Sequence, residues 1–298
     1  MISSVAVIGA GLMGGGIARN LAGSFKVTVY DVNEERVRRC VEVGATPSTS
    51  IRDAISGSDL VITSLPLPET VRAVVSENIA AAKAGALWMD VSTIDPGTAL
   101  ELEELLGASG LGFVACPLGK GPAQAEAGTL PLFVGCREEL LGELSAIFDC
   151  IGERVHYLGS VQAATTFKIA SNMIGMSNLA ALAEGYALCR RCDVDEVAFA
   201  EALQSTGAWS NQADLRLGMM RQRDFDARFT VDLALKDVRL AVDVAARRGV
   251  PAPVGAAGLN QLVSAHRHGW GRSDAAALFK LIEPDREFSQ VRGAATDR

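Results

Sequence analysis

The feature that most constrains this chain is a glycine-rich turn near its start. A short apolar run, "SVAVIG", leads into this turn, and a helix-forming stretch, "GGGIARNLA", follows at once. In a turn between a strand and a helix, Gly9 allows the tight bend, Gly11 lets a pyrophosphate approach the backbone, and Gly14 lets the helix pack closely on the strand. The free N–H groups at the helix N-terminus attract negative charge. The predicted cofactor contacts in this turn are Gly9, Gly11, Leu12, Met13 and Gly14.

A second apolar run, "KVTVYD", ends at Asp31. An acidic side chain at this point can accept hydrogen bonds from the ribose hydroxyls of the adenosine, and it repels the 2′-phosphate of NADP. The next residues are Val32 and Asn33, so no arginine follows directly. We therefore predict that the cofactor is NAD and not NADP. The alternative is a glycine-rich turn that binds no cofactor, and the combination of turn, helix and acid disfavours it.

Short apolar runs alternate with amphipathic stretches from residue 2 to about residue 158. The runs are "VAVIGA", "KVTVYD", "DLVITSLP", "ALWMDVS", "GFVACP", "LPLFVGC" and "RVHYLG". Most of them are continuously apolar, which is typical of strands buried on both faces beneath crossover helices. The pattern predicts an α/β domain over residues 1–160, with a doubly wound, largely parallel sheet.

The second half of the chain lacks such runs. Residues 161–191 continue without proline and are rich in Ala, Leu and Met, which predicts one long helix that connects two domains or packs against a second subunit. Further helices are expected at about 194–204, 232–248, 252–268 and 273–283. Residues 161–298 are therefore predicted to form an all-α domain. The long apolar helix favours a homodimer or homotetramer, although a helix apolar all round can also be buried within one chain.

Charge and composition narrow the possible partners. The formal net charge of −7 would repel nucleic acid and anionic membrane surfaces. No apolar run is long enough to span a bilayer. The six cysteines are scattered, which suits a reducing cytoplasm, and we expect a cytoplasmic protein. Cys189 and Cys192 form a Cys-x-x-Cys in a helical stretch, but no second pair at zinc spacing accompanies them, so we predict helix packing and no metal site.

Lys168 and Asn172 are candidates for chemistry. They lie four residues apart in the predicted long helix, so both side chains face the same way. Transfer of a hydride to a carbonyl needs a proton donor beside the oxygen, and Lys168 stands in an otherwise apolar stretch. A lysine that extends from the edge of the core into water would show the same pattern. The spacing by itself does not separate these two readings.

Five ordered blocks resemble the β-hydroxyacid dehydrogenase family nearly from end to end of the chain. They are "IGAGLMGGGIARNL", "DVSTIDP", "ACPLGKGPAQAEAGTLPLFVGC", "FKIASNMIGMSNLAALAEG" and "FTVDLALKDVRLAVDVA". The resemblance implies a Rossmann domain, an all-α domain that dimerises around the long helix, and a site in the cleft between them. It also implies an oxidoreductase that acts on short 3-hydroxy acids such as 3-hydroxyisobutyrate, or on semialdehydes such as tartronate semialdehyde and sulfolactaldehyde.

The resemblance assigns roles to particular residues. It implies that Lys168 is the general acid and base and that Asn172 orients the substrate. Ser92 and Thr93 in "DVSTIDP" would line the substrate and cofactor site, and a strand end followed by an ordinary cap before Pro96 is the less favoured alternative. The remaining implied cofactor contacts are Leu65 and Pro66 on the nucleotide side and Lys236 at the nicotinamide end.

One block departs from the commonest family pattern, Pro-Val-Ser-Gly-Gly. Here the sequence reads Pro-Leu-Gly-Lys-Gly, so Gly119 replaces the serine and Lys120 adds a cation before Gly121. This version looks more like the sulfolactaldehyde reductase one, which has glycine and then arginine. We hypothesise that Gly119, Lys120 and Gly121 bind a strongly anionic substrate group, because a point charge suits oxyanions of less planar geometry. A solvated lysine at a helix start is the open alternative.

The leading hypothesis is an NAD-dependent 3-hydroxyacid dehydrogenase or semialdehyde reductase, with Lys168 as the proton carrier and a small anionic hydroxy acid or aldehyde as substrate. The nearest enzymatic alternative is an NADPH-dependent imine reductase. Such enzymes usually have aspartate or tyrosine where Lys168 stands, and Asp31 disfavours NADPH. The alternative from another class is a non-catalytic nucleotide-binding scaffold, since folds of this kind can be kept for binding alone.

Overall fold

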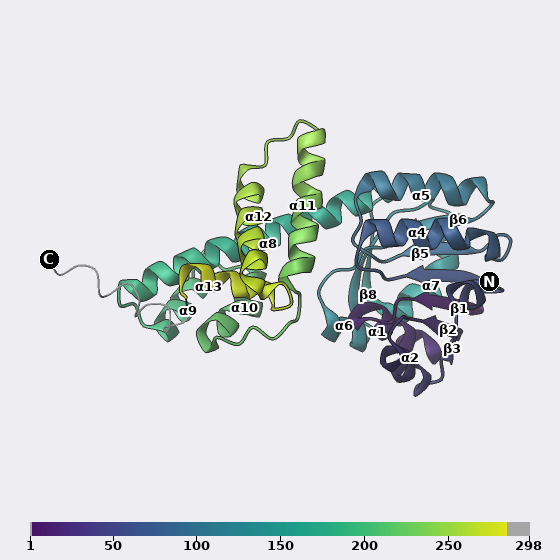
Figure 1. The fold of residues 1–298 in the computed structure, drawn as a ribbon, viewed down its shortest axis with the longest axis horizontal. Helices are drawn as coiled ribbons and strands as arrows, with labels where there is room; N and C mark the ends of the chain where they lie inside the picture. Colours follow the sequence, from purple (N-terminus) through teal and green to yellow (C-terminus); the bar gives the residue numbers. More distant parts are fainter. Residues whose placement is uncertain (1, 285–298) are drawn as a thin grey trace. The chain divides into compact units, whose positions relative to one another are not determined.

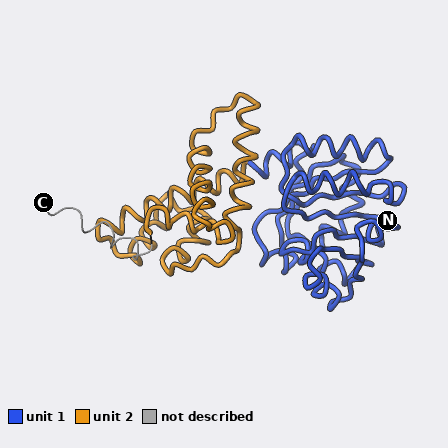
Figure 2. The backbone as a smooth tube through the Cα atoms, in the orientation of Figure 1, with its two compact units in different colours: residues 1–169 blue, residues 170–298 orange. Residues whose placement is uncertain are grey.

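The structure, a computed structural model, describes residues 2–284. The chain divides into two compact units, Met1–Ile169 and Ala170–Arg298 (Figure 2). The division falls inside helix α8 (Val161–Arg191), nine residues after the boundary expected at residue 160. The first turns of α8 belong to unit 1 because Val161 and Ala164 are buried in its core.

Unit 1 is built on a parallel sheet, as the sequence predicts, and this sheet has six strands (Figure 1). The strand order is β3-β2-β1-β4-β5-β6, so the chain starts in the middle of the sheet, runs outward to β3 and returns to extend the other side. The carboxyl ends of β1 and β4 meet at this change of direction, where ligands of doubly wound sheets bind. The strands are β1 (Ser4–Ile8), β2 (Lys26–Tyr30), β3 (Thr46–Pro47), β4 (Leu60–Thr63), β5 (Leu87–Asp90) and β6 (Gly112–Ala115).

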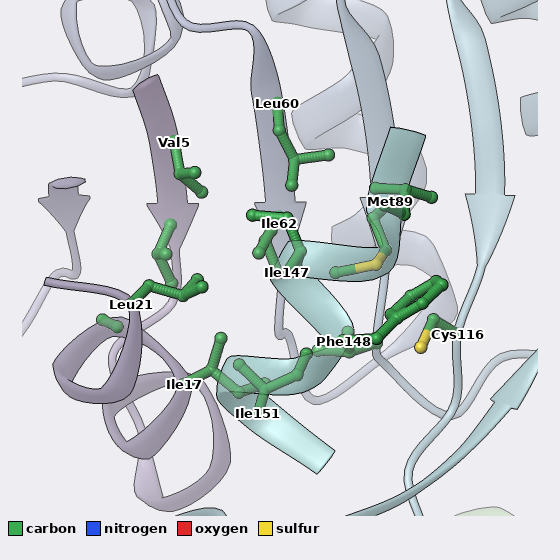
Figure 3. Packing of buried hydrophobic residues seen from close by; sticks show 14 of the residues in the cluster. Val5, Ile17, Leu21, Leu60, Ile62, Met89, Cys116, Ile147, Phe148 and Ile151 are labelled. Carbon is green, nitrogen blue, oxygen red and sulfur yellow. The ribbon is translucent and has the colours of Figure 1, made fainter. Parts of the chain in front are cut away.

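Helices cover both faces of this sheet, and for this reason its strands are continuously apolar. Val5 and Val7 of β1 face one core cluster, whereas Ala6 and Ile8 face another. Figure 3 shows the first cluster, in which strand residues such as Ile62 pack against α1 and α7. The helices of unit 1 before α8 are α1 (Leu12–Ala22), α2 (Glu34–Val41), α3 (Ile51–Ile55), α4 (Pro68–Asn78), η1 (Ile79–Ala81), α5 (Pro96–Ala108), α6 (Pro122–Ala127) and α7 (Leu140–Ile151).

Two expected strands form a sheet of their own. β7 (Leu130–Val134) pairs in parallel with β8 (Gly152–Tyr157), and α7 connects them. Isolated antiparallel bridges join Ala115 to Gly135 and Leu118 to Leu132, so the chain after β6 runs beside β7 in the opposite direction. Burial in β7 alternates, unlike in the central strands. A strand with one buried face does not need helices on both sides.

The described part of unit 2, residues 170–284, is built from helices, and the 31-residue helix predicted over residues 161–191 is confirmed as α8. Its core gathers residues from α8, α10, α11, α12 and η3. Figure 1 shows α11 and α12 side by side. The sequence did not predict α10 as a helix. The remaining elements are α9 (Glu196–Gln204), α10 (Asn211–Gln222), α11 (Val231–Arg247), α12 (Pro253–Ala265), the π-helix η2 (His266–Trp270), η3 (Ala275–Leu278) and α13 (Phe279–Ile282).

Among residues 2–284, no helix combines the length and the apolarity that a membrane span requires.

Candidate active site

The glycine turn has the geometry that its sequence predicts. Gly9 adopts a left-handed φ of +95°, and a Cβ there would lie 2.3 Å from the carbonyl oxygen of Ser64. A Cβ on Gly14 would lie 2.0 Å from the carbonyl oxygen of Gly9, so the start of α1 packs directly on the turn. A Cβ on Gly11 would meet nothing within 4 Å. Gly9 and Gly14 are therefore required by packing within the fold, whereas the space at Gly11 is open to a ligand.

Asp31 is tied to this turn by hydrogen bonds. Its Oδ2 accepts from the backbone N–H of Ala10 at 2.7 Å, and its Oδ1 accepts from that of Asn33 at 2.8 Å. A guanidinium nitrogen of Arg36 lies 3.7 Å from Oδ1. Only 6% of the Asp31 side chain is exposed, against 53% for Arg36. Arg36 was not among the predicted site residues, because it does not follow Asp31 directly along the chain; the first turn of α2 brings it back to the acid.

A buried network joins the ends of β4 and β5. The Ser92 hydroxyl donates to Asp90 Oδ1 at 2.7 Å and accepts from the backbone N–H of Leu65 at 2.9 Å. Thr63 Oγ1 donates to the same Asp90 oxygen at 2.7 Å and accepts from the indole N–H of Trp88 at 3.3 Å. Ser92, Asp90 and Thr63 are all buried. The neighbouring residues of the predicted site are more exposed than Ser92: Leu65 and Thr93 are half-buried, and Pro66 is exposed.

The departure at Gly119 has a local cause. A Cβ there would lie 3.1 Å from Cβ and Cγ of Pro131 and 3.2 Å from the ring of Phe133, so a serine would crowd β7. The backbone N–H of Gly119 donates to the Pro131 carbonyl at 2.7 Å. Lys120 has a left-handed φ of +58°, and its Nζ lies 3.0 Å from Oε1 of Glu153 in β8. Both side chains of this ion pair are half exposed.

Unit 2 holds a buried acid that gathers two of the predicted residues. Asp237 in α11 accepts a hydrogen bond on Oδ2 from Nδ2 of Asn172 in α8, at 2.5 Å. Its Oδ1 lies 2.7 Å from Nζ of Lys236. The Asp237 side chain is 3% exposed and that of Lys236 15%. Asn172 therefore has its side-chain direction set by a residue 65 positions away.

Lys168 lies one helical turn before Asn172 in α8, and its side chain is half-buried. The predicted residues thus fall into two groups. Unit 1 holds the glycine turn, Asp31, the Leu65–Ser92 network, the Gly119–Gly121 loop and Lys168. Unit 2 holds Asn172, Lys236 and the buried Asp237.

Buried thiols lie close to the strand ends. Burial raises the pKa of Cys116 far above its usual range, and burial raises the pKa of Cys136 to about 11. Both thiols therefore stay protonated at neutral pH, and a protonated thiol is a poor nucleophile.

Comparisons with known proteins match both units. Residues 4–159 match the NAD binding domain of 6-phosphogluconate dehydrogenase, and residues 162–282 match the family described as the NAD-binding domain of NADP-dependent 3-hydroxyisobutyrate dehydrogenase. The chain is 30% identical to 2-(hydroxymethyl)glutarate dehydrogenase of Eubacterium barkeri over 285 residues, which covers 94% of each chain. It is also 30% identical to 3-sulfolactaldehyde reductase of Escherichia coli, covering 94% of this chain and 96% of that one.

A solved structure shows the same fold. The 3-hydroxyisobutyrate dehydrogenase of Mycobacterium tuberculosis, solved with L-serine, superposes with a TM-score of 0.87 at 24% identity, and the match covers 95% of this chain and 99% of that one. Together with the family matches over both units, these relatives show that the chain belongs to the β-hydroxyacid dehydrogenase family and is an NAD-binding oxidoreductase that acts on a CH–OH group.

Proposed function

We propose that this enzyme moves a hydride between NAD(H) and C3 of a short anionic 3-hydroxy acid, which exchanges an alcohol for a semialdehyde. The observation that carries the proposal is the pair Lys168 and Asn172 on successive turns of α8, with Asn172 held by the buried Asp237. Two relatives are named for small acidic substrates, a hydroxymethylglutarate and a sulfolactaldehyde. The substrate class proposed here follows those names and the charge at Lys120.

The cofactor half of the proposal rests on unit 1. The open space at Gly11 and the N-terminus of α1 would hold the pyrophosphate, with Leu12 and Met13 beside it. Asp31 would accept hydrogen bonds from the adenosine ribose through its remaining lone pairs. Leu65, Pro66 and Thr93 would line the nucleotide, and Lys236 at the nicotinamide end stays a prediction. When bound, NAD supplies or accepts the hydride.

Lys168 is the proposed proton carrier. In the direction of reduction, its Nζ gives a proton to the carbonyl oxygen as that oxygen becomes a hydroxyl. In the direction of oxidation, the neutral amine takes the hydroxyl proton. Asn172 would hold the substrate in the orientation that this transfer requires, because its amide is itself oriented by Asp237.

Lys120 is the proposed contact for the anionic end of the substrate, together with the neighbouring Gly119 and Gly121, while Ser92 would line another part of the substrate site. Its present partner is Glu153, and an exposed ion pair of this kind contributes only about 0–1 kcal/mol. A carboxylate, sulfonate or phosphate can therefore replace Glu153 as the partner of Lys120 at little expense in stability.

The first experiment measures NADH consumption with short aldehydes that carry a carboxylate, a sulfonate or a phosphate. We expect turnover with at least one of them, and we expect Lys168→Ala to abolish turnover while NADH binding persists. Turnover that survives the substitution would contradict the role of Lys168. Turnover of cyclic imines with NADPH, and of no aldehyde, would favour the imine reductase alternative. Tight NADH binding without any turnover would favour a binding protein.

We also propose that unit 2 pairs with a second copy of this chain through α8. Ile174 and Leu188 are 58% and 65% exposed, and they lie on one face of the helix with the exposed Ala181 between them. Light scattering after size exclusion would give the mass. A monomer of 31.3 kDa at micromolar concentration would contradict the proposal. Cytoplasmic location likewise stays a prediction.

A further inference from the structure

The hydrogen bonds from the Thr63 and Ser92 hydroxyls to Asp90 Oδ1 run in one direction, because a carboxylate can only accept. The indole N–H of Trp88 can only donate, so Thr63 Oγ1 accepts from it and turns its own proton toward Asp90. The backbone N–H of Leu65 can also only donate, so Ser92 Oγ accepts from it and turns its proton toward the same Asp90 oxygen. Two donors that cannot be reversed thus fix both hydroxyls.

The loop after β4 lies against the glycine turn. A Cβ on Gly9 would lie 2.3 Å from the Ser64 carbonyl oxygen and 3.2 Å from Cδ2 of Leu65, and a Cβ on Gly14 would lie 2.8 Å from Cβ of Ser64. Any shift of Ser64 or Leu65 would therefore disturb the packing of the glycine turn, which is proposed to bind the pyrophosphate. The backbone of Leu65 is held in place by Ser92, and Ser92 is held by Asp90.

We propose that Asp90 is a positioning residue for the nucleotide: through Ser92 it holds the Leu65 backbone, and with it the loop after β4, against the glycine turn. The proposal deepens the proposed function, on which its relevance to turnover rests. It also limits what Ser92 can do. Its proton is committed to Asp90, so Ser92 can accept a hydrogen bond from a bound ligand but cannot donate one to an anionic substrate group.

The chain provides a matched control for this idea. Thr63 and Ser92 each donate to the same Asp90 oxygen at 2.7 Å, and both are buried, yet only Ser92 also bonds to the loop after β4. Thr63→Val and Ser92→Ala therefore both remove a buried hydrogen bond to Asp90. Only Ser92→Ala releases the Leu65 N–H.

The test measures the Kd of NADH by fluorescence titration and the midpoint of thermal unfolding for wild type, Thr63→Val, Ser92→Ala and Asp90→Asn. We expect both hydroxyl variants to lower the unfolding midpoint. We expect Ser92→Ala to raise the Kd of NADH by about tenfold, the size of one lost hydrogen bond, while Thr63→Val leaves it within about twofold. Asp90→Asn should raise the Kd as well, because an amide oxygen is a weaker acceptor than a carboxylate.

A double variant distinguishes positioning from independent effects. If Asp90 acts through Ser92, Asp90→Asn should raise the Kd less in the Ser92→Ala background than in wild type. Equal changes in the Kd for Thr63→Val and Ser92→Ala, or an unchanged Kd for Ser92→Ala, would overturn the proposal. Failure of every aldehyde to turn over would contradict the proposed function instead, and it would leave this comparison of NADH binding intact.

Discussion

Asn172 in α8 and Asp237 in α11 are joined by a hydrogen bond of 2.5 Å from Nδ2 to Oδ2. Asp237 also lies 2.7 Å from the ammonium of Lys236, and its side chain is nearly inaccessible to water. A buried carboxylate that accepts from the Asn172 amide holds this amide in one geometry, and such a charge-assisted bond is stronger than a neutral one. Asp237 therefore sets the direction of the amide that is proposed to orient the substrate.

Replacing Asp237 by asparagine should reduce activity. The change leaves the Lys236 ammonium without its carboxylate and weakens the bond to Asn172. We expect kcat/KM to fall roughly 10- to 100-fold, since a hydrogen bond to a charged group contributes about 1.5–3 kcal/mol. The steady-state rate with the best aldehyde of the panel checks this. Asp243→Asn, an exposed acid on the same helix, is the control, and an equal loss there would show that the effect is not local.

Alanine at two glycines of the turn should have different effects, on stability at Gly14 and on NADH binding at Gly11. Gly14→Ala places a methyl group 2.0 Å from the Gly9 carbonyl oxygen, and such overpacking destabilises by about 1–3 kcal/mol. Gly11→Ala has open space around its Cβ, so we expect little change in unfolding but weaker NADH binding, because the methyl group occupies the space proposed for the pyrophosphate. Thermal melts and NADH titrations of both variants decide this. Unaltered NADH affinity in Gly11→Ala would place the pyrophosphate elsewhere.

Asp31 and Arg36 together should determine the choice between NADH and NADPH. Asp31→Asn keeps an acceptor for the Ala10 N–H but removes the negative charge, and Arg36 is then free to pair with a 2′-phosphate. We expect the ratio of kcat/KM for NADPH over NADH to rise by about tenfold or more, which corresponds to about 1.4 kcal/mol. Adding Arg36→Gln should remove most of that gain. A ratio that stays at the wild-type value in Asp31→Asn would contradict the role of the carboxylate.

The stability of unit 2 should depend strongly on one buried ion pair. Arg216 Nε donates to Asp274 Oδ1 at 2.8 Å, and the side chains are 6% and 0% exposed. Arg216→Met leaves the Asp274 charge buried and unpaired, and breaking a buried pair in this way destabilises by about 3–5 kcal/mol. Chemical denaturation measures the loss. The control is Arg191→Gln, which breaks the ion pair between Arg191 and Glu283. Because the Arg191 side chain is 67% exposed, this change should lower the free energy of unfolding by about 1 kcal/mol or less. Similar losses in both variants would contradict the argument.

The network around Asp90 cannot be predicted from the sequence alone. The block "DVSTIDP" points to Ser92 and Thr93, whereas Asp90 is an acid at the end of a strand whose partners are not neighbours along the chain. Its partners Thr63 and Ser92 are brought together only when β4 and β5 pair in register, with Thr63 opposite Asp90. The missed helix α10 has a similar cause: Arg216 is buried there against Asp274, so the apolar periodicity of the segment is broken.

Features that depend on near neighbours can be predicted from the chain. The glycine turn, the continuously apolar strands of the parallel sheet and the uninterrupted α8 follow from local sterics and from the periods of the strand and the helix. Which distant side chains meet depends on the tertiary structure. It separated β7 and β8 from the main sheet, paired Lys120 with Glu153, brought Arg36 to Asp31 and joined Asn172 to Asp237. These contacts depend on how elements pack in three dimensions, and no short-range pattern in the chain encodes that packing.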